Sequence, residues 1–422
     1  MKIAILICAL VSVALAKVDY TGHQVYRAFP NRLQHEIIRS FGESVNFDVW
    51  SDYRGEGDFI DFRVSPDWKP KIDVLLARNR IPHEVFVEDL EESFANRVDL
   101  NAPRLGPADP QFYEKYHTFS EISNWIDEFV SMNSALVGVT NIGKSYEGRD
   151  IRSVKVSTGA GRPAFVINCG LHSREWVTPA TCMYVANQLI PSQLTSWYGI
   201  DDAVTDVLNK VDIYFIPVSN PDGYEYTWTT DRMWRKTRSP AANNGCLTDC
   251  NGVDPNRNWD NHWDAPGGSS TNCCSDTFRG PKPFSEVEVN SQKEFVMGIP
   301  NVRAYIDVHA YSQYWMYPYG WSETPAKDAA TLAQVGQDSI DAIRAVHGKR
   351  YETGSIADVI YVATGSSADY FYDVGITCSF AAELRDQGRY GFTLPEAQIV
   401  PTGEEAFAGL MVMAQAVADG TC

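Results

Sequence analysis

The chain has 422 residues, enough for a large core and an accessory domain. It carries 54 acidic and 36 basic side chains, a net charge of −18, which argues against nucleic acid and anionic membranes as partners. No run approaches the ~20 apolar residues that a membrane-spanning helix needs, so we also expect no membrane-inserted segment.

The first sixteen residues have the pattern of a secretory signal. Met1-Lys2 supplies the charged start, an apolar run follows, and Ala14-Leu15-Ala16 provides a small-x-small cleavage site. We therefore predict a signal peptide over 1–16 and a secreted, extracellular protein that opens at Lys17.

Cysteine usage agrees with an oxidising compartment. One of the nine cysteines, Cys8, lies in the predicted signal, and an even number remains. The clusters Cys246/Cys250 and Cys273/Cys274 lack the paired C-x-x-C spacing of a structural zinc site, which favours two disulfides. Their connectivity stays open at this level.

Residues 17–90 contain no cysteine and alternate between strand and helix patterns. The order is β-α-β-β-α-β, which predicts a ferredoxin-like α+β module with two helices on one face of a small sheet. The expected strands are 23–29, 45–50, 58–64 and 83–88, and the expected helices are 30–41 and 68–79.

Residues 91–104 read as a connecting segment. An acidic, helical stretch ends near Arg97 and is followed by a run rich in Pro, Gly and Asn. Exposed linkers are where proteases cut, and Arg97 or Arg104 would suit a trypsin-like enzyme. An ordinary hinge and an activation site are equally compatible with this composition.

Residues 105–422 alternate apolar runs with longer amphipathic segments. This pattern predicts an α/β domain with a mixed, mostly parallel central sheet covered by helices on both faces. Asn220-Pro221-Asp222-Gly223 reads as a turn, and Ser285 and Thr402 as helix caps. The expected strands are 151–156, 164–169, 211–218, 302–308 and 377–383, and the expected helices are 122–130, 179–190, 327–346 and 402–418.

Chemically useful side chains follow several of these strands. His172 and Glu175 come after one strand, His309 closes another, and Glu383 ends a third. Ligands of open α/β sheets bind beyond the carboxyl ends of strands. A catalytic zinc takes three His or carboxylate ligands, so these residues make a candidate zinc site.

Two acidic residues have competing interpretations. Asp254 could accept the second N–H of a ligating imidazole, or it could be a turn residue in its Gly-Val-Asp-Pro loop. Glu383 on an apolar strand is costly unless it is catalytic or paired with Arg385 or Arg235.

Five motifs in this order make the chain resemble the secreted zinc metallocarboxypeptidases of the pancreatic carboxypeptidase A/B family, including their pro-segment. The resemblance covers nearly all of 17–422. The motifs are His172-Ser173-Arg174-Glu175-Trp176, Asn220-Pro221-Asp222-Gly223-Tyr224, Trp234-Arg235-Lys236-Thr237-Arg238, Asp254-Pro255-Asn256-Arg257-Asn258-Trp259 and Glu383-Leu384-Arg385-Asp386-x-Gly388-Arg389-Tyr390-Gly391-Phe392.

The resemblance implies a role for each site residue. His172, Glu175 and His309 would hold one zinc ion, with Asp254 behind a histidine. Glu383 would be the general base and Arg235 the cation that stabilises the oxyanion. The remaining positions would bind substrate: Asn256, Arg257 and Tyr361 the terminal carboxylate, and Arg174, Tyr311 and Phe392 the preceding residues.

The same resemblance bears on specificity. The B type, which removes Lys and Arg, has an Asp at the position of Ala368, and Ile356 and Gly320 add to an apolar pocket. We expect an A-type preference for aromatic or large aliphatic C-terminal residues. The alternatives are B-type specificity aided by Asp369, and a catalytically silent peptide-binding relative.

The family also implies disulfides and activation. Cys169–Cys182 and Cys250–Cys274 match disulfides found in relatives. An additional disulfide, Cys246–Cys273, is expected beside Cys250–Cys274. The resemblance assigns no counterpart to Cys378 and Cys422, and a disulfide between them is a guess. The expected molecule is a monomeric zymogen whose 17–104 region occludes the cleft until a trypsin-like protease cuts it. A digestive role is the family-level expectation.

Overall fold

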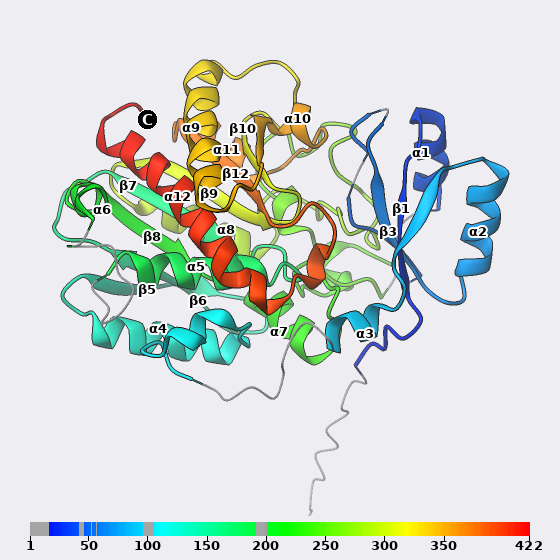
Figure 1. Cartoon of the computed structure of the whole chain (residues 1–422), viewed down its shortest axis with the longest axis horizontal. Coiled ribbons are helices and arrows are strands. Elements are labelled where there is room, and N and C mark those ends of the chain that lie inside the picture. Colours follow the sequence, from blue (N-terminus) through cyan, green and yellow to red (C-terminus); the bar gives the residue numbers. More distant parts are fainter. Residues whose placement is uncertain are drawn as a thin grey trace, which may run out of the picture.

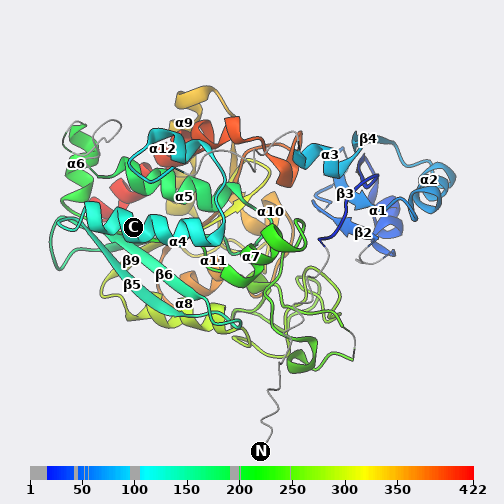
Figure 2. The same ribbon diagram turned by 90° about the horizontal axis from the view of Figure 1, so that it is seen from below.

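The computed structural model describes residues 17–41, 46–51, 53–55, 57–95, 105–190, 199, 201–247 and 249–422. The predicted signal peptide and the two candidate cleavage residues, Arg97 and Arg104, lie outside these ranges. Described residues 17–95 form a small lobe at one end of a large lobe made by 105–422 (Figure 1, Figure 2).

The small lobe is the predicted ferredoxin-like module. Its antiparallel sheet has the order β2-β3-β1-β4, and both helices pack on one face around Tyr26, Phe62 and Leu76. The elements are β1 (Gln24–Ala28), α1 (Arg32–Arg39), β2 (Phe47–Val49), β3 (Ile60–Val64), α2 (Lys69–Arg78) and β4 (His83–Val87), followed by α3 (Leu90–Ala95).

The helix-free face of this small sheet is buried against the large lobe. Successive strand residues point to opposite faces, so Tyr26 belongs to the small lobe's own core whereas Val25 joins the core of the large lobe. Asp61 and Arg63 are also buried. Charged side chains are rarely buried without partners, which marks this face as a built interface.

The large lobe contains the predicted mixed sheet of eight strands, in the order β11-β10-β12-β9-β7-β8-β6-β5. The four central strands β12, β9, β7 and β8 run parallel. The strands are β5 (Val137–Lys144), β6 (Asp150–Val156), β7 (Ala164–Cys169), β8 (Asp212–Ile216), β9 (Val302–Ala310), β10 (Tyr314–Tyr317), β11 (Glu352–Ser355) and β12 (Cys378–Leu384).

Helices cover both faces of this sheet, as expected. The core on one side includes residues of α4, α5, α9 and α12, and that on the other side residues of α8 and α11. The helices are α4 (Phe119–Met132), α5 (Val177–Gln188), α6 (Asp202–Leu208), α7 (Pro221–Thr229), α8 (Val287–Gly298), α9 (Ala329–His347), α10 (Ile356–Val359), α11 (Ser367–Asp373) and α12 (Ile399–Ala418).

Three local predictions were wrong at helix starts. Asn220 does not open a simple turn, because its side chain accepts from Gly223 N and caps α7. Ser285 does not cap α8: its hydroxyl donates to Glu286 Oε1 instead. Helix α12 begins before Thr402, whose hydroxyl donates to the Gln398 carbonyl. In the last two cases the hydroxyl has another acceptor nearby.

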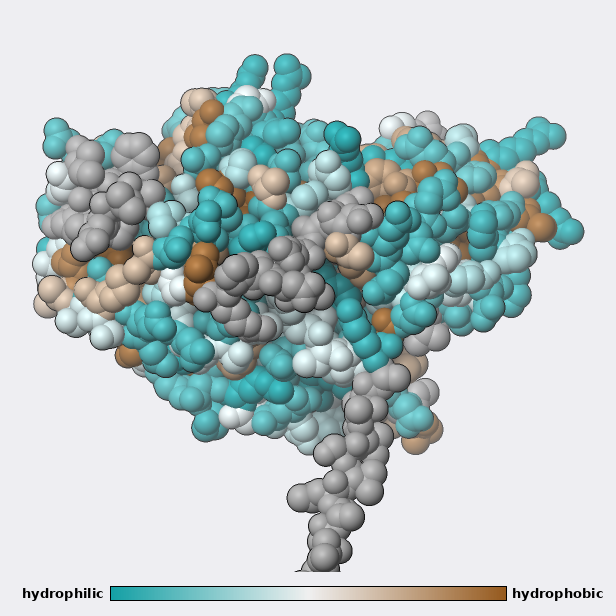
Figure 3. All heavy atoms as spheres, turned by 60° about the horizontal axis from the view of Figure 1, so that its bottom comes forward, coloured by the Kyte–Doolittle hydropathy of each residue, from teal (hydrophilic) through white to brown (hydrophobic). Residues whose placement is uncertain are grey.

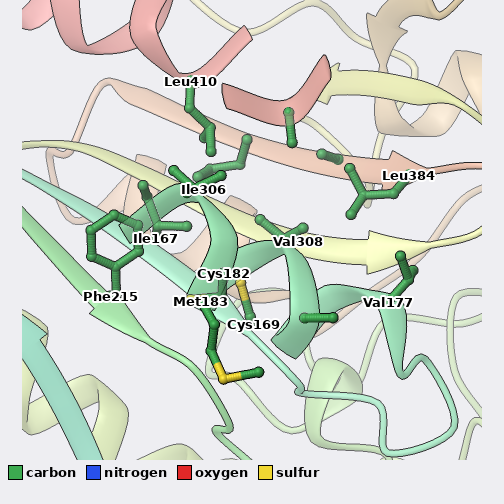
Figure 4. Close-up of a cluster of buried hydrophobic side chains, with 14 of the residues drawn as sticks. Ile167, Cys169, Val177, Cys182, Met183, Phe215, Ile306, Val308, Leu384 and Leu410 are labelled. Atoms are coloured by element: carbon green, nitrogen blue, oxygen red, sulfur yellow. The ribbon is translucent and has the colours of Figure 1, made fainter. Parts of the chain in front are cut away.

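The disulfides include Cys250–Cys274, Cys246–Cys273 and the guessed Cys378–Cys422. The predicted Cys169–Cys182 bridge is absent, and both residues are free thiols buried between β7 and α5 (Figure 4). Burial raises the pKa of the Cys169 thiol well above its ordinary value, and contact with Cys182 adds to this. Because oxidation proceeds through the thiolate, such burial disfavours it.

The face in Figure 3 is mostly hydrophilic, with hydrophobic residues in small scattered groups. Within the described ranges, no helix combines the length and apolar character needed to cross a bilayer.

We expect Cys169 and Cys182 to be the two cysteines after Lys17 that an alkylating agent labels without reductant. Labelling should require unfolding, because each residue is only 1% exposed. Peptide mass spectrometry would locate the label, with a fully reduced sample as the control. Recovery of an intact Cys169–Cys182 cross-link would contradict the assignment.

Candidate metal and catalytic site

Strand register brings the distant site residues together. Strand β7 ends at Cys169, and His172 and Glu175 lie between it and α5. In the neighbouring parallel strand β9, His309 is the penultimate residue, and Glu383 of β12 lies directly opposite it. The carboxyl ends of three parallel strands therefore converge on one point.

His172, Glu175 and His309 form a buried cluster whose ligand atoms lie within 4.8 Å of one another. Glu175 Oε1 lies 2.9 Å from His172 Nδ1, and its Oε2 lies 3.0 Å from His309 Nδ1. Burial acts to raise the pKa of Glu175, but its interactions and hydrogen bonds with His172 and His309 outweigh burial and hold that pKa well below its usual range. A carboxylate that stays ionised between two imidazoles is the donor set that zinc prefers.

Acidic side chains hold the outer nitrogen of each histidine. Asp254 Oδ1 lies 3.0 Å from His172 Nε2, and Asp307 Oδ2 lies 3.0 Å from His309 Nε2. Each outer contact leaves Nδ1 facing the cluster centre, which fixes the ring orientation that a metal site needs. Asp254 is also the N-cap of a short 3₁₀ helix, so the residue has both roles considered from the sequence.

The buried Oε2 atom of Glu383 has no hydrogen-bond partner among the described residues. Glu383 is the one carboxyl of this site with such an oxygen. Burial raises the pKa of Glu383 to about 8, the charge of Glu175 adds to this, and His309 and Arg235 oppose it. A carboxyl group that exchanges its proton near neutral pH can serve as a general base or acid. The donor set and this orphaned oxygen fit a catalytic zinc site.

Arg235 lies beside the cluster and is held by Asp254. Its Nη2 is 2.9 Å from Asp254 Oδ2, and its Nη1 is 4.0 Å from Glu175 Oε1. Burial lowers the pKa of Arg235, but Asp254 outweighs that effect, so the group stays cationic. A fixed guanidinium at this position can stabilise a developing negative charge.

The three predicted carboxylate-binding residues also meet. Arg257 Nη2 donates to the Tyr361 hydroxyl over 3.0 Å, and Arg257 Nη1 donates to the Asn256 carbonyl. Arg257 and Tyr361 line the cavity that contains Glu383. Asn256 is turned differently, with Nδ2 3.1 Å from His309 Nε2 and Oδ1 accepting from Ser367 N.

Ala368 and Ile356 pack in a small apolar cluster next to the cavity, together with Tyr314, Met316 and Ala381. The adjacent Asp369 is buried, and both of its oxygens accept from backbone amides, those of Gly320 and Trp321. Burial raises the pKa of Asp369 to about 7. Because both Asp369 oxygens are already hydrogen-bonded, this carboxyl is not a free counter-charge for the apolar cluster.

The small lobe closes this site from outside. A cavity of about 740 Å³ is lined by site residues including Arg235 and Glu383 and by small-lobe residues including Trp50. The Trp50 ring packs edge-on against Phe392, and the Tyr311 hydroxyl donates to Asp61 over 3.1 Å. Arg174, the third predicted subsite residue, is paired with Asp48.

Several residues at the site were not identified from the sequence: Asp307 beside His309, Met316 and Ala381 in the apolar cluster, and Asp276, which lines the cavity. Asp307 could have been found, because it stands two residues before His309 on an apolar strand and so shares its face. The others carry no signal of their own, because loop and sheet packing alone bring them to the site.

Comparison with known proteins agrees with this geometry. A family model described as zinc carboxypeptidase matches residues 122–409, and one described as carboxypeptidase activation peptide matches 26–97. The chain is 40% identical to carboxypeptidase A2 of Rattus norvegicus, covering 99% of both sequences. It is 39% identical to carboxypeptidase A1 of Homo sapiens, covering 98% of both.

Solved structures show the same architecture. Thrombin activatable fibrinolysis inhibitor matches with a TM-score of 0.85 and 35% identity, over 94% of this chain and 99% of that one. Carboxypeptidase A of Helicoverpa armigera matches with a TM-score of 0.82 and 29% identity, over 96% and 99%.

We expect Asp254→Asn to weaken zinc binding by roughly 10- to 100-fold, because the change removes the anionic partner of His172. Competition with a chromogenic chelator would measure the dissociation constant. Asp260→Asn removes an exposed carboxylate a few residues away and is the matched control. Equal zinc affinities in the two variants would remove Asp254 from this role.

Proposed function

The chain belongs to the zinc carboxypeptidase family, as a zymogen with one catalytic zinc ion, and on this premise we propose that it releases aromatic or large aliphatic residues from peptide C-termini. One observation carries the proposal: Glu383, Arg235 and Arg257 border the same cavity as Glu175, a member of the buried zinc-type donor set. Each has a separate role in cutting one terminal bond.

His172, Glu175 and His309 would hold the metal. The chemistry that zinc supplies when bound is Lewis acidity, which polarises a carbonyl and lowers the pKa of water to about 7. Glu383 accepts the proton of the attacking water and later passes it to the leaving amine. Arg235, held by Asp254, donates to the oxyanion of the tetrahedral intermediate.

The Arg257–Tyr361 pair accounts for exopeptidase action. A guanidinium binds a carboxylate through two parallel hydrogen bonds, and Arg257 already directs Nη2 toward the Tyr361 hydroxyl. A free C-terminus provides this carboxylate, and an internal peptide bond does not. Recognition here therefore restricts cleavage to the last residue. Asn256, beside His309, completes this part of the site.

The apolar cluster around Ala368 and Ile356 supports the A-type preference. A lysine or arginine side chain would place a charge among apolar groups, and the neighbouring carboxyl of Asp369 is already bonded to backbone amides. An unpaired buried charge costs several kcal/mol. Arg174, Tyr311 and Phe392 border the cavity and would contact the preceding residues of the substrate.

We assign 1–16 as the signal peptide of a secreted protein, 17–90 as the pro-domain, 91–104 as the activation segment and 105–422 as the catalytic domain. A trypsin-like protease would cut at Arg97 or Arg104. The activation-peptide match and the contacts of the small lobe with Arg174, Tyr311 and Phe392 support this arrangement. We further propose that the protein acts as a monomer in an extracellular, digestive setting.

In the trypsin-activated protein, Glu383→Gln should lower kcat by about 10²- to 10⁴-fold, because it removes the proton acceptor. Metal analysis should still find one zinc ion per chain, since the substituted residue is not a ligand. Glu404→Gln, a partly exposed site on α12, is the matched control. Turnover within tenfold of the parent would exclude Glu383 as the base.

Blocked dipeptides ending in Phe and in Arg test specificity. The parent should favour Phe by at least ~100-fold in kcat/KM, because the Arg charge would be buried unpaired. Ala368→Asp should reverse the preference, whereas Ala368→Asn adds similar bulk without charge and should not. Equal cleavage of both dipeptides by the parent would rule out the A-type assignment.

A further inference from the structure

Arg174 lies between two carboxylates from different lobes. Its Nη1 is 3.2 Å from both carboxylate oxygens of Asp48, on the small lobe, and 3.1 Å from Asp276 Oδ2, on the large lobe. The Arg174 side chain is 2% exposed here and also packs over the Phe392 ring at 4.2 Å. Its charge is therefore compensated from both sides.

Asp276 belongs to a firmly held loop. It lies two residues after Cys274, and Cys273 and Cys274 are bonded to a second loop through Cys246 and Cys250. Its side chain is 27% exposed even with the small lobe in place. Asp276 would therefore remain beside Arg174 after the small lobe departs.

The charges at this contact balance within each lobe. Arg63 Nε of the small lobe lies 3.6 Å from Asp48 Oδ2, so each lobe contributes one guanidinium and one carboxylate. On separation, Asp48 keeps Arg63 and Arg174 keeps Asp276. Each of these four groups therefore keeps a partner in its own lobe, so this contact adds no unpaired charge that would oppose release.

We propose that Asp276 is the resident counter-ion of Arg174, that it sets the charge preference of the substrate subsite at Arg174, and that it weakens the hold of the pro-domain. The inference rests on the proposed peptidase function. With Asp276 present, the subsite is close to neutral and accepts uncharged side chains. Without it, the bare guanidinium would favour a carboxylate, whether from Asp48 or from an acidic residue of the substrate.

Asp276 acts through Arg174, so it is a positioning residue. Its effect on charge preference can be measured with pairs of peptides that differ by one charge. Peptides ending in Phe would carry either Asp or Asn at each of the two preceding positions. For each enzyme, the measured quantity is kcat/KM for the Asp-containing peptide divided by kcat/KM for the Asn-containing peptide. In the trypsin-activated Asp276→Asn variant this ratio should rise about three- to tenfold over the parent at one of the two positions, through a change in KM. Asp276→Glu should restore the parent ratio, and Arg174→Gln should abolish the effect of Asp276→Asn.

Asp264→Asn is the control, because it neutralises an exposed carboxylate that does not line the cavity. Its ratio should equal that of the parent. An unchanged ratio in Asp276→Asn at both positions, or the same rise in Asp264→Asn, would overturn the subsite proposal.

Retention of the pro-fragment gives a second readout without catalysis. After trypsin cleavage, gel filtration at increasing salt should separate the fragment from Asp276→Asn only at a higher salt concentration than from the parent. Equal or easier release would overturn the proposed effect on the pro-domain. The two hypotheses can fail separately. If neither the parent nor any variant cleaves a peptide, but Asp276→Asn still raises the salt concentration needed to release the pro-fragment, the peptidase function would fail and the counter-ion role would stand.

Discussion

The parallel register of β7, β9 and β12 is the constraint on which the rest of this structure depends. Backbone hydrogen bonding places Glu383 opposite His309 and ends β7 just before His172. A slip of one residue along β12 would turn Glu383 to the other face of the sheet. The zinc-type cluster and its neighbouring carboxyl group therefore depend on sheet pairing more than on local sequence.

Compensation of buried charge is the second constraint. Asp254 contacts both His172 and Arg235, so one carboxylate orients a metal ligand and retains a cation. The same principle governs the interface between the lobes, where Asp61 pairs with Arg27 and accepts from Tyr311. The small lobe thus contacts the same groups, Arg174, Tyr311 and Phe392, that we propose as substrate subsites.

The sequence predicted the element types well where the apolar pattern was long. It missed β5, β10 and β11, whose residues gain their strand partners only in the assembled sheet. It also assigned hydroxyl caps at Ser285 and Thr402, although nearby acceptors compete for these groups. The Cys169–Cys182 bridge was inferred from relatives, whereas the buried pair is present as two thiols.

The sequence by itself determined the two-lobe plan, the α/β class and the three residues of the candidate zinc site, because apolar periodicity and short motifs are local properties of the chain. Only the tertiary structure decided which carboxylates hold each histidine, that Asp369 is already bonded to backbone amides, and that Asp48 and Asp276 share Arg174. These contacts join residues tens to hundreds of positions apart. Their existence depends on register, loop bridging and burial, which no single stretch of sequence contains.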